Sequence, residues 1–251
     1  MGTPVRGRTI GTLAIVAALL LGACGGEGAA PATGSREVTF ESSDGVALGG
    51  RLFGPDDAPA GIVLAHMSPS DQSSWFDFAE RLGREGYRVL TFNFRGYCPG
   101  GEAGCSEGER SVPAIWQDVE GAIGELRGRG ARRIGLVGAS MGGTASLVAA
   151  SKEGADVDAI VTLSAPAEVE GLDANGEVLS QVPGAKLFIA GHEDAAAAAA
   201  VDILYAQSLQ PKRPVILTTG DHGTDILTGN QAGIASTEII GWLERYVAVD
   251  G

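Results

Sequence analysis

The residues best suited to chemistry in this sequence lie within the segment 132–151. The segment begins with an apolar, β-branched run, turns sharply through G-A-S-M-G-G, and continues with small and apolar residues. This order predicts a buried strand, a tight turn and a helix. The turn has the pattern G-x-S-x-G, with Ser140 at its tip. A hydroxyl presented in this way can attack a carbonyl group when a base takes its proton.

The glycines on either side of Ser140 have a physical reason to be there. A strand that reverses directly into a helix holds the serine in an unfavourable φ/ψ region, and side chains at Gly138 and Gly142 would collide across the turn. The following helix points its first N–H groups, Met141's among them, at the place where negative charge would develop. The pentapeptide alone is a weak signal, and an idle serine in a strand-to-helix turn is the alternative.

Three other expected strand ends carry side chains that could assist Ser140. In an open parallel sheet, the loops at the carboxyl ends of the strands hold the ligands, so these residues are expected at one edge of the sheet. The strands concerned span 61–65, 185–190 and 215–218. The residues that follow them are His66 and Met67, then His192, Glu193 and Asp194, and finally Asp221 and His222.

The elements that must position these residues alternate along the chain. An initial hairpin, with strands near 38–40 and 46–48 around an Asp-Gly turn, precedes strand 61–65. From there on, strands alternate with helices, which predicts an α/β fold with a mostly parallel, doubly wound sheet. We expect further strands at 88–92, 134–137 and 157–163, and helices at 74–85, 113–126, 195–209 and 231–247, the first of them capped by Ser73 or Ser74.

In these features the sequence resembles the α/β-hydrolase family, over roughly residues 38–247. The match consists of G-A-S-M-G-G at the turn, H-E-D after strand 185–190 and D-H-G after the last strand. The chain order serine, acid, histidine is that of the family. The resemblance assigns Ser140 as the nucleophile, His222 as the general base and Asp194 as the acid that orients His222.

The same resemblance places the oxyanion hole at the backbone N–H groups of Met67 and Met141. The family frequently has His-Gly in this loop, whereas this sequence has His66-Met67. The methionine side chain is therefore expected to narrow the oxyanion site. Glu193 and Asp221 remain alternatives to Asp194, because one residue of slip in a turn reverses the side-chain direction. We interpret His66 as a structural residue that braces the oxyanion loop, and His192 as a loop residue outside the triad.

The function implied by the resemblance is hydrolysis of carboxylic esters by a serine enzyme without a cofactor. About twenty residues separate strands 157–163 and 185–190, too few for a large lid, which suits small, cap-poor members such as simple carboxylesterases and dienelactone-hydrolase-like proteins. Serine in place of the cysteine of dienelactone hydrolases favours the esterase side. A thioesterase, acyltransferase or peptidase would use the same triad, and a non-catalytic binding protein on this fold is a further alternative.

The N-terminal segment has the pattern of a secretory signal. Arg6 and Arg8 precede an apolar run at 10–21, which is too short to span a bilayer comfortably. The following L-G-A-C resembles the bacterial lipobox, in which the bond before the cysteine is cut and the cysteine carries lipid. By that resemblance Cys24 becomes the lipidated N-terminus; the alternative is an ordinary cleaved signal.

The expected domain organisation follows from this cleavage. Residues 1–23 form the lipoprotein signal, residues 24–36 a flexible tether rich in small and polar residues, and residues 37–251 the hydrolase domain. We therefore expect an extracytoplasmic protein that is anchored to the bacterial cell membrane. The formal net charge of −13, from 31 acidic and 18 basic residues, argues against nucleic acid as a partner.

The remaining cysteines, Cys98 and Cys105, lie in one loop, C-P-G-G-E-A-G-C. In an oxidising compartment we expect a disulfide between them. Metal binding is the alternative, but two cysteines without neighbouring histidines make an incomplete zinc set. The sequence contains no phosphate-binding loop, nucleotide fingerprint or cluster of metal ligands, and the oligomeric state stays open.

Overall fold

The computed structural model of the chain describes residues 1–4, 7, 34–152 and 154–249. The predicted signal, Cys24 and most of the predicted tether therefore lie outside the described residues, and the first strand begins at Arg36. Nowhere in the described ranges is there a helix long and apolar enough to cross a membrane.

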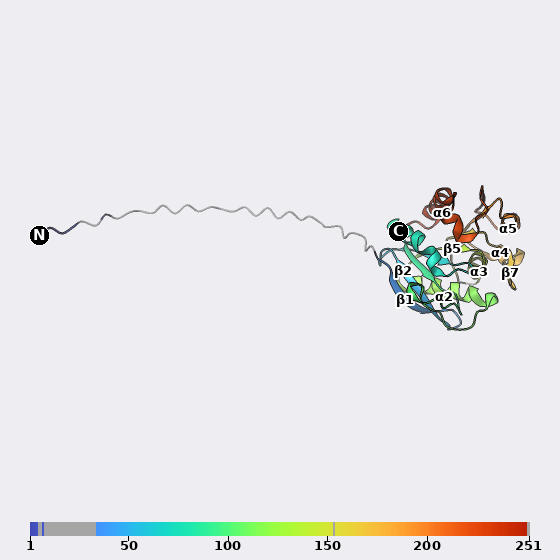
Figure 1. The fold of residues 1–251 in the computed structure, drawn as a ribbon, viewed down its shortest axis with the longest axis horizontal. Coiled ribbons are helices and arrows are strands. Elements are labelled where there is room, and N and C mark those ends of the chain that lie inside the picture. The colour runs from blue at the N-terminus through green and yellow to red at the C-terminus, as the bar shows by residue number, and fades with distance from the viewer. Residues whose placement is uncertain (5–6, 8–33, 153, 250–251) are drawn as a thin grey trace. The chain divides into compact units, whose positions relative to one another are not determined.

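The centre of the domain is an eight-stranded sheet (Figure 1). Its strands are β1 (Arg36–Glu41), β2 (Ala47–Phe53), β3 (Ala60–Ala65), β4 (Arg88–Phe92), β5 (Arg133–Ala139), β6 (Ala159–Leu163), β9 (Ala185–Gly191) and β10 (Lys212–Leu217). They lie in the order β1-β2-β4-β3-β5-β6-β9-β10. The pairs β1–β2 and β2–β4 are antiparallel and all the others are parallel, which confirms the predicted fold class.

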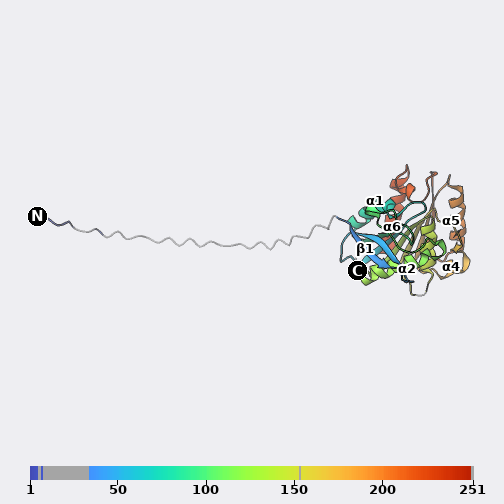
Figure 2. The same ribbon diagram turned by 60° about the horizontal axis from the view of Figure 1, so that its bottom comes forward.

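Helices cover both faces of this sheet because its central strands are apolar on both sides. In β3, Ile62 and Leu64 pack with the core of one face, and Val63 and Ala65 with the core of the other. One face carries α1 (Phe76–Arg84) and α6 (Ala232–Tyr246), seen near each other in Figure 2. The other face carries α2 (Ile115–Gly128), α3 (Met141–Ala150), α4 (Gly176–Gln181) and α5 (Ala195–Gln207).

Several elements begin or end a few residues from the expected positions, and two of these differences have a clear physical reason. The helix predicted from residue 74 is preceded by a 3-10 turn, Gln72–Trp75, and Asp71 caps that turn through a side-chain bond of 2.8 Å from the N–H of Ser73. The last strand begins at Lys212, three residues before the apolar run. It lies at the edge of the sheet beside β9 alone, so Pro214 can sit in it without leaving a neighbouring strand unbonded.

Only small elements separate β6 from β9, as the predicted minimal lid requires. They are the two-stranded ribbon of β7 (Glu168–Val169) and β8 (Leu172–Asp173), followed by α4. Leu172 and Leu179 are buried in the core on the α2 face, so this segment packs on the domain.

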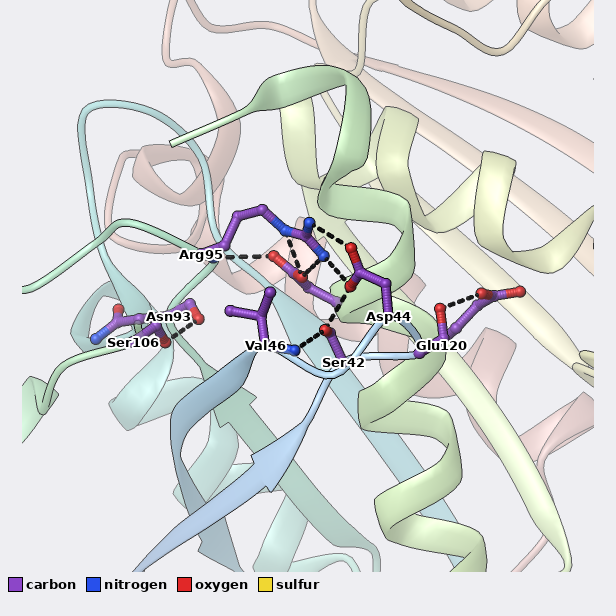
Figure 3. Close-up of polar contacts among 9 residues, drawn as sticks. Ser42, Asp44, Val46, Asn93, Arg95, Ser106 and Glu120 are labelled. Atoms are coloured by element: carbon purple, nitrogen blue, oxygen red, sulfur yellow. Dashed lines mark hydrogen bonds and ion pairs between the residues drawn. The ribbon is translucent and has the colours of Figure 1, made fainter. Parts of the chain in front are cut away.

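The long loop after β4 is fastened at its start by Arg95. Its guanidinium group donates to the carboxylates of Asp44, in the β1–β2 turn, and Asp118, on α2. Figure 3 shows the contact between Arg95 and Asp44. This ion cluster joins the hairpin, the loop and α2. Because the side chain of Asp118 is fully buried, removal of one charged partner would leave a buried charge unpaired and destabilise the fold.

Two further links close the same loop on itself. Cys98 and Cys105 form a disulfide, the pairing expected from the sequence. The hydroxyl of Ser106 donates to the carbonyl oxygen of Asn93 over 2.6 Å (Figure 3). The part of the loop from 93 to 106 is therefore closed on itself, and the N–H of Phe94 near its start donates to His66, the residue after β3.

Candidate active site

Ser140 occupies a strained turn between β5 and α3. Its φ of 48° and ψ of −121° lie outside the regions that non-glycine residues normally adopt. The backbone N–H of Ser140 donates to the carbonyl oxygen of Leu163 on β6 over 2.8 Å, which fixes the turn to the neighbouring strand. The side chain is partly exposed.

The structure gives the steric reason for the flanking glycines. A methyl group on Gly138 would overlap the carbonyl group of Gly142 across the turn. A methyl group on Gly142 would lie 2.5 Å from the carbonyl oxygens of Ala65 and His66. Both positions therefore exclude a side chain. At Gly138 the collision is across the turn, as expected from the sequence, whereas at Gly142 it is with the loop after β3.

His222 and Asp194 form a hydrogen-bonded pair. Nδ1 of His222 lies 2.6 Å from Oδ2 of Asp194. A neutral imidazole that donates from Nδ1 to a carboxylate keeps a lone pair on Nε2, so Nε2 can accept a proton. The His222 side chain is 44% exposed and that of Asp194 is 15% exposed, so the pair is open to a ligand on the histidine side.

Neither of the two alternative acids bonds to His222 among the described residues. Oδ2 of Asp221 accepts from the hydroxyl of Thr219 over 2.7 Å, and a methyl group on Gly229 would overlap the Asp221 carboxylate. Glu193 is exposed. Among the described residues, Asp194 is the carboxylate that bonds to His222.

The loops after β3, β5 and β10 meet at Gly223. A methyl group on Gly223, whose φ is +58°, would lie 3.4 Å from Cβ of Ala139 and would collide with Sδ of Met67. Since Gly223 follows His222 and Ala139 precedes Ser140, the predicted base and nucleophile lie on touching loops. No hydrogen bond joins the Ser140 hydroxyl to His222 in the described structure.

The two predicted oxyanion donors belong to these same loops. Met67 follows the end of β3, and Met141 is the first residue of α3, where a helix leaves its N–H groups without intrahelical partners. In the part of the chain that the structure describes, neither N–H takes part in a turn or loop hydrogen bond. Both side chains are buried, and that of Met67 packs against Gly223.

His66 braces the loop that carries Met67. It is fully buried, Nδ1 lies 2.8 Å from the carbonyl oxygen of Met67, and Nε2 accepts from the N–H of Phe94 over 3.1 Å. Burial lowers the pKa of His66 to about 4. The imidazole is therefore neutral near pH 7 and holds the oxyanion loop against the loop after β4.

His192 lies outside the pair formed by His222 and Asp194. Its side chain is exposed, and its backbone N–H donates to the carbonyl oxygen of Leu217 over 2.7 Å. The described residues contain no group of three or more side chains that could hold a metal ion.

One aromatic residue beside the site was missed by sequence reasoning. Tyr97, in the loop after β4, places its ring against His66 and its hydroxyl near Met141. No spacing rule connects it with the three motifs, because it comes from a long irregular loop. Locally, the sequence shows only that Tyr97 directly follows the turn formed by Arg95 and Gly96.

Similar folds occur in solved esterases and a dienelactone hydrolase. An esterase from Pyrococcus furiosus matches at 19% identity and a TM-score of 0.68, over 86% of this chain and 94% of that one. A dienelactone hydrolase from Anabaena variabilis matches at 21% identity and a TM-score of 0.69, over 85% of this chain and 99% of that one. The esterase domain of a Rhodothermus marinus protein matches at 22% identity and a TM-score of 0.67, over 86% of this chain and 100% of that one.

At these identities the similarity concerns the fold. None of the curated proteins matches the sequence. The model of the family described as alpha/beta hydrolase fold matches residues 62–232, a range that includes Ser140, Asp194 and His222. The chain belongs to the α/β-hydrolase family.

Proposed function

We propose that this protein is a serine hydrolase that cleaves carboxylic esters through an acyl-enzyme on Ser140. The observation that carries the proposal is the 2.6 Å hydrogen bond between His222 and Asp194, on a loop that touches the strained turn of Ser140. Similar folds in esterases, and a serine rather than a cysteine at the turn, support the ester class.

In the acylation step, Nε2 of His222 removes the proton of the Ser140 hydroxyl as the oxygen attacks the ester carbonyl. The tetrahedral intermediate then collapses. The imidazolium of His222 gives the proton to the alkoxy group, and the alcohol leaves. Asp194 keeps the imidazole oriented and stabilises its positive charge in the intermediate.

In the deacylation step, a water molecule replaces the alcohol. His222 takes a proton from this water as it attacks the acyl-serine, then returns the proton to Ser140, and the carboxylic acid leaves. In both steps the backbone N–H groups of Met67 and Met141 stabilise the negative charge on the carbonyl oxygen. Because these donors belong to the main chain, their side chains can change at less cost than Ser140.

Labelling with a fluorophosphonate, followed by mass spectrometry of the modified peptide, tests the nucleophile. We expect modification at Ser140 in the wild-type protein, and neither labelling nor ester hydrolysis in Ser140→Ala. Labelling that persists in Ser140→Ala would refute the assignment. A folded protein without activity on a broad ester panel would favour the non-catalytic binding protein instead.

The substrates that suit this site are small esters. The segment between β6 and β9 is short, and the His222 side chain is 44% exposed, which favours an open site suited to short acyl groups. Rates with p-nitrophenyl acetate, butyrate and decanoate test this: we expect the decanoate to be the poorest substrate. Parallel assays with thioesters, amides and acyl acceptors separate the alternative uses of the triad.

We also propose that the hydrolase is a lipid-anchored extracytoplasmic protein. The L-G-A-C pattern before Cys24 and the Cys98–Cys105 disulfide support this placement. Metabolic labelling with an alkyne fatty acid should mark the wild-type protein and not Cys24→Ala, and the wild type should be recovered with membranes. Equal labelling of both proteins would refute the anchor.

A further inference from the structure

The side chain of Tyr97 lies between the two loops that carry the proposed oxyanion donors. The centroid of its ring is 4.7 Å from that of His66, the residue before Met67, at an interplanar angle of 70°. Its hydroxyl oxygen is 4.0 Å from Sδ of Met141, the residue after Ser140. Tyr97 therefore contacts side chains from both of the loops that carry the proposed oxyanion donors.

The hydroxyl of Tyr97 has only a weak acceptor in this position. A thioether sulfur is a poor hydrogen-bond acceptor, and 4.0 Å is a long contact. Among the described residues the hydroxyl has no oxygen or nitrogen partner. A partly buried phenol gains free energy when it donates to a stronger acceptor, and a substrate carbonyl oxygen that becomes negatively charged is such an acceptor.

The backbone of Tyr97 is fixed by its loop. Its N–H donates to the carbonyl oxygen of Phe94 over 3.1 Å, and its own carbonyl oxygen accepts from the N–H of Ser106 over 2.8 Å. The next residue is Cys98, whose disulfide to Cys105 closes the loop. The backbone that presents the phenol is thus held by two hydrogen bonds next to a loop closed by a disulfide.

The ring of Tyr97 is fixed by Arg110. The guanidinium carbon of Arg110 lies 4.7 Å from the ring centroid, and its terminal nitrogen donates to the hydroxyl of Ser68, next to Met67, over 2.7 Å. A cation above the ring is attracted by its π-electrons, which favours this position of the ring. A donor held in place before the reaction loses no free energy to reorganisation during it.

We propose that Tyr97 is a catalytic residue of the ester hydrolysis, whose hydroxyl donates a hydrogen bond to the carbonyl oxygen as it becomes the oxyanion. This inference rests on the proposed serine hydrolase function. Tyr97 keeps its proton throughout, so no covalent bond of the phenol forms or breaks. It acts as a third donor beside the N–H groups of Met67 and Met141.

Tyr97→Phe tests the proposal, because it removes the hydroxyl and keeps the ring against His66 and Arg110. Loss of one oxyanion donor lowers kcat by roughly 100- to 1,000-fold, and we expect a fall in this range for p-nitrophenyl butyrate with little change in KM. A trifluoromethyl ketone, which forms a tetrahedral adduct with the active serine, should bind more weakly by a similar factor. Tyr205→Phe, on α5 and beneath Lys212, is the matched control and should leave both values unchanged.

The outcomes separate this inference from the proposed function. If the wild type is labelled at Ser140 and hydrolyses esters while Tyr97→Phe keeps its kcat and its affinity for the ketone, Tyr97 is not a donor. If Tyr97→Phe loses activity together with thermal stability, and its affinity for the ketone does not change, the ring serves packing alone and the proposal is overturned. A wild type that is neither labelled at Ser140 nor active would overturn both proposals.

Discussion

The carboxylate of Asp194 serves two groups at once. Oδ2 lies 2.6 Å from Nδ1 of His222, while Oδ1 accepts from the N–H of Ala197 over 3.4 Å and caps α5. The N-terminus of a helix carries partial positive charge, and a side chain with a negative charge is attracted to it. The residue that orients the histidine is therefore held by a helix packed on the sheet, and its two roles can be separated by substitution.

Asp194→Asn should abolish most activity and leave the fold intact. An asparagine still caps the helix, but it no longer presents a carboxylate to His222, and loss of this charge in a triad typically lowers kcat about 10⁴-fold. Asp194→Ala should lose similar activity and, in addition, about 1 kcal/mol of unfolding free energy with the cap. Ester kinetics and urea denaturation measure the two effects. The matched controls Asp221→Asn and Glu193→Gln should keep kcat within a few-fold; a large loss in either would reassign the acid.

Ser140→Gly should stabilise the protein while it destroys activity. Ser140 has a φ of 48°, a conformation that costs a non-glycine residue about 1–3 kcal/mol and glycine much less. Ser140→Ala removes the same hydroxyl and keeps the strain, so it is the matched control. We expect Ser140→Gly to unfold at a higher urea concentration than Ser140→Ala. The difference in the free energy of unfolding should be about 1 kcal/mol or more. Equal midpoints would show that the turn stores no strain.

Gly223→Ala should disturb the site more than its backbone conformation alone explains. The added methyl group would collide with Sδ of Met67 and crowd Ala139, which pushes the His222 loop away from Ser140. Gly130→Ala is the control, because Gly130 has a φ of +94° with open space around it. Both variants should lose about 1–2 kcal/mol of stability from the left-handed backbone. Only Gly223→Ala should also lose kcat, and an unchanged kcat would contradict the proximity of the two loops.

The neutral, buried state of His66 should make stability depend on pH. Its folded pKa of about 4 is below the ordinary histidine value of 6.5, so the unfolded chain binds the proton first as the pH falls. The free energy of unfolding should therefore decrease as the pH falls from about 6.5 to about 4, and His66 accounts for about 3 kcal/mol of this decrease. Below about pH 4, His66 makes no further contribution to the pH dependence. Urea denaturation of the wild type and of His66→Gln over this range measures the difference. Identical pH slopes in the two proteins would contradict the assignment.

Much of the fold follows from local pattern. The continuous apolar runs of β3, β4 and β9 predicted strands that the structure has within a residue or so, because strands buried on both faces admit few polar side chains. The edge strand β10 was harder to predict: one side of it has no partner, so Lys212, Arg213 and Pro214 are tolerated there and hide its start.

The sequence by itself determined the sheet, the glycine turn that exposes Ser140, and the strand ends at which candidate acids and bases occur, because these depend on short-range sterics and on the period of apolar residues. Tertiary structure alone decided which carboxylate meets His222, because Glu193, Asp194 and Asp221 are chemically alike and differ only in the direction that two turns give them. It also decided that Tyr97 lies beside the oxyanion loops, since the course of a long loop depends on contacts between residues far apart in the chain.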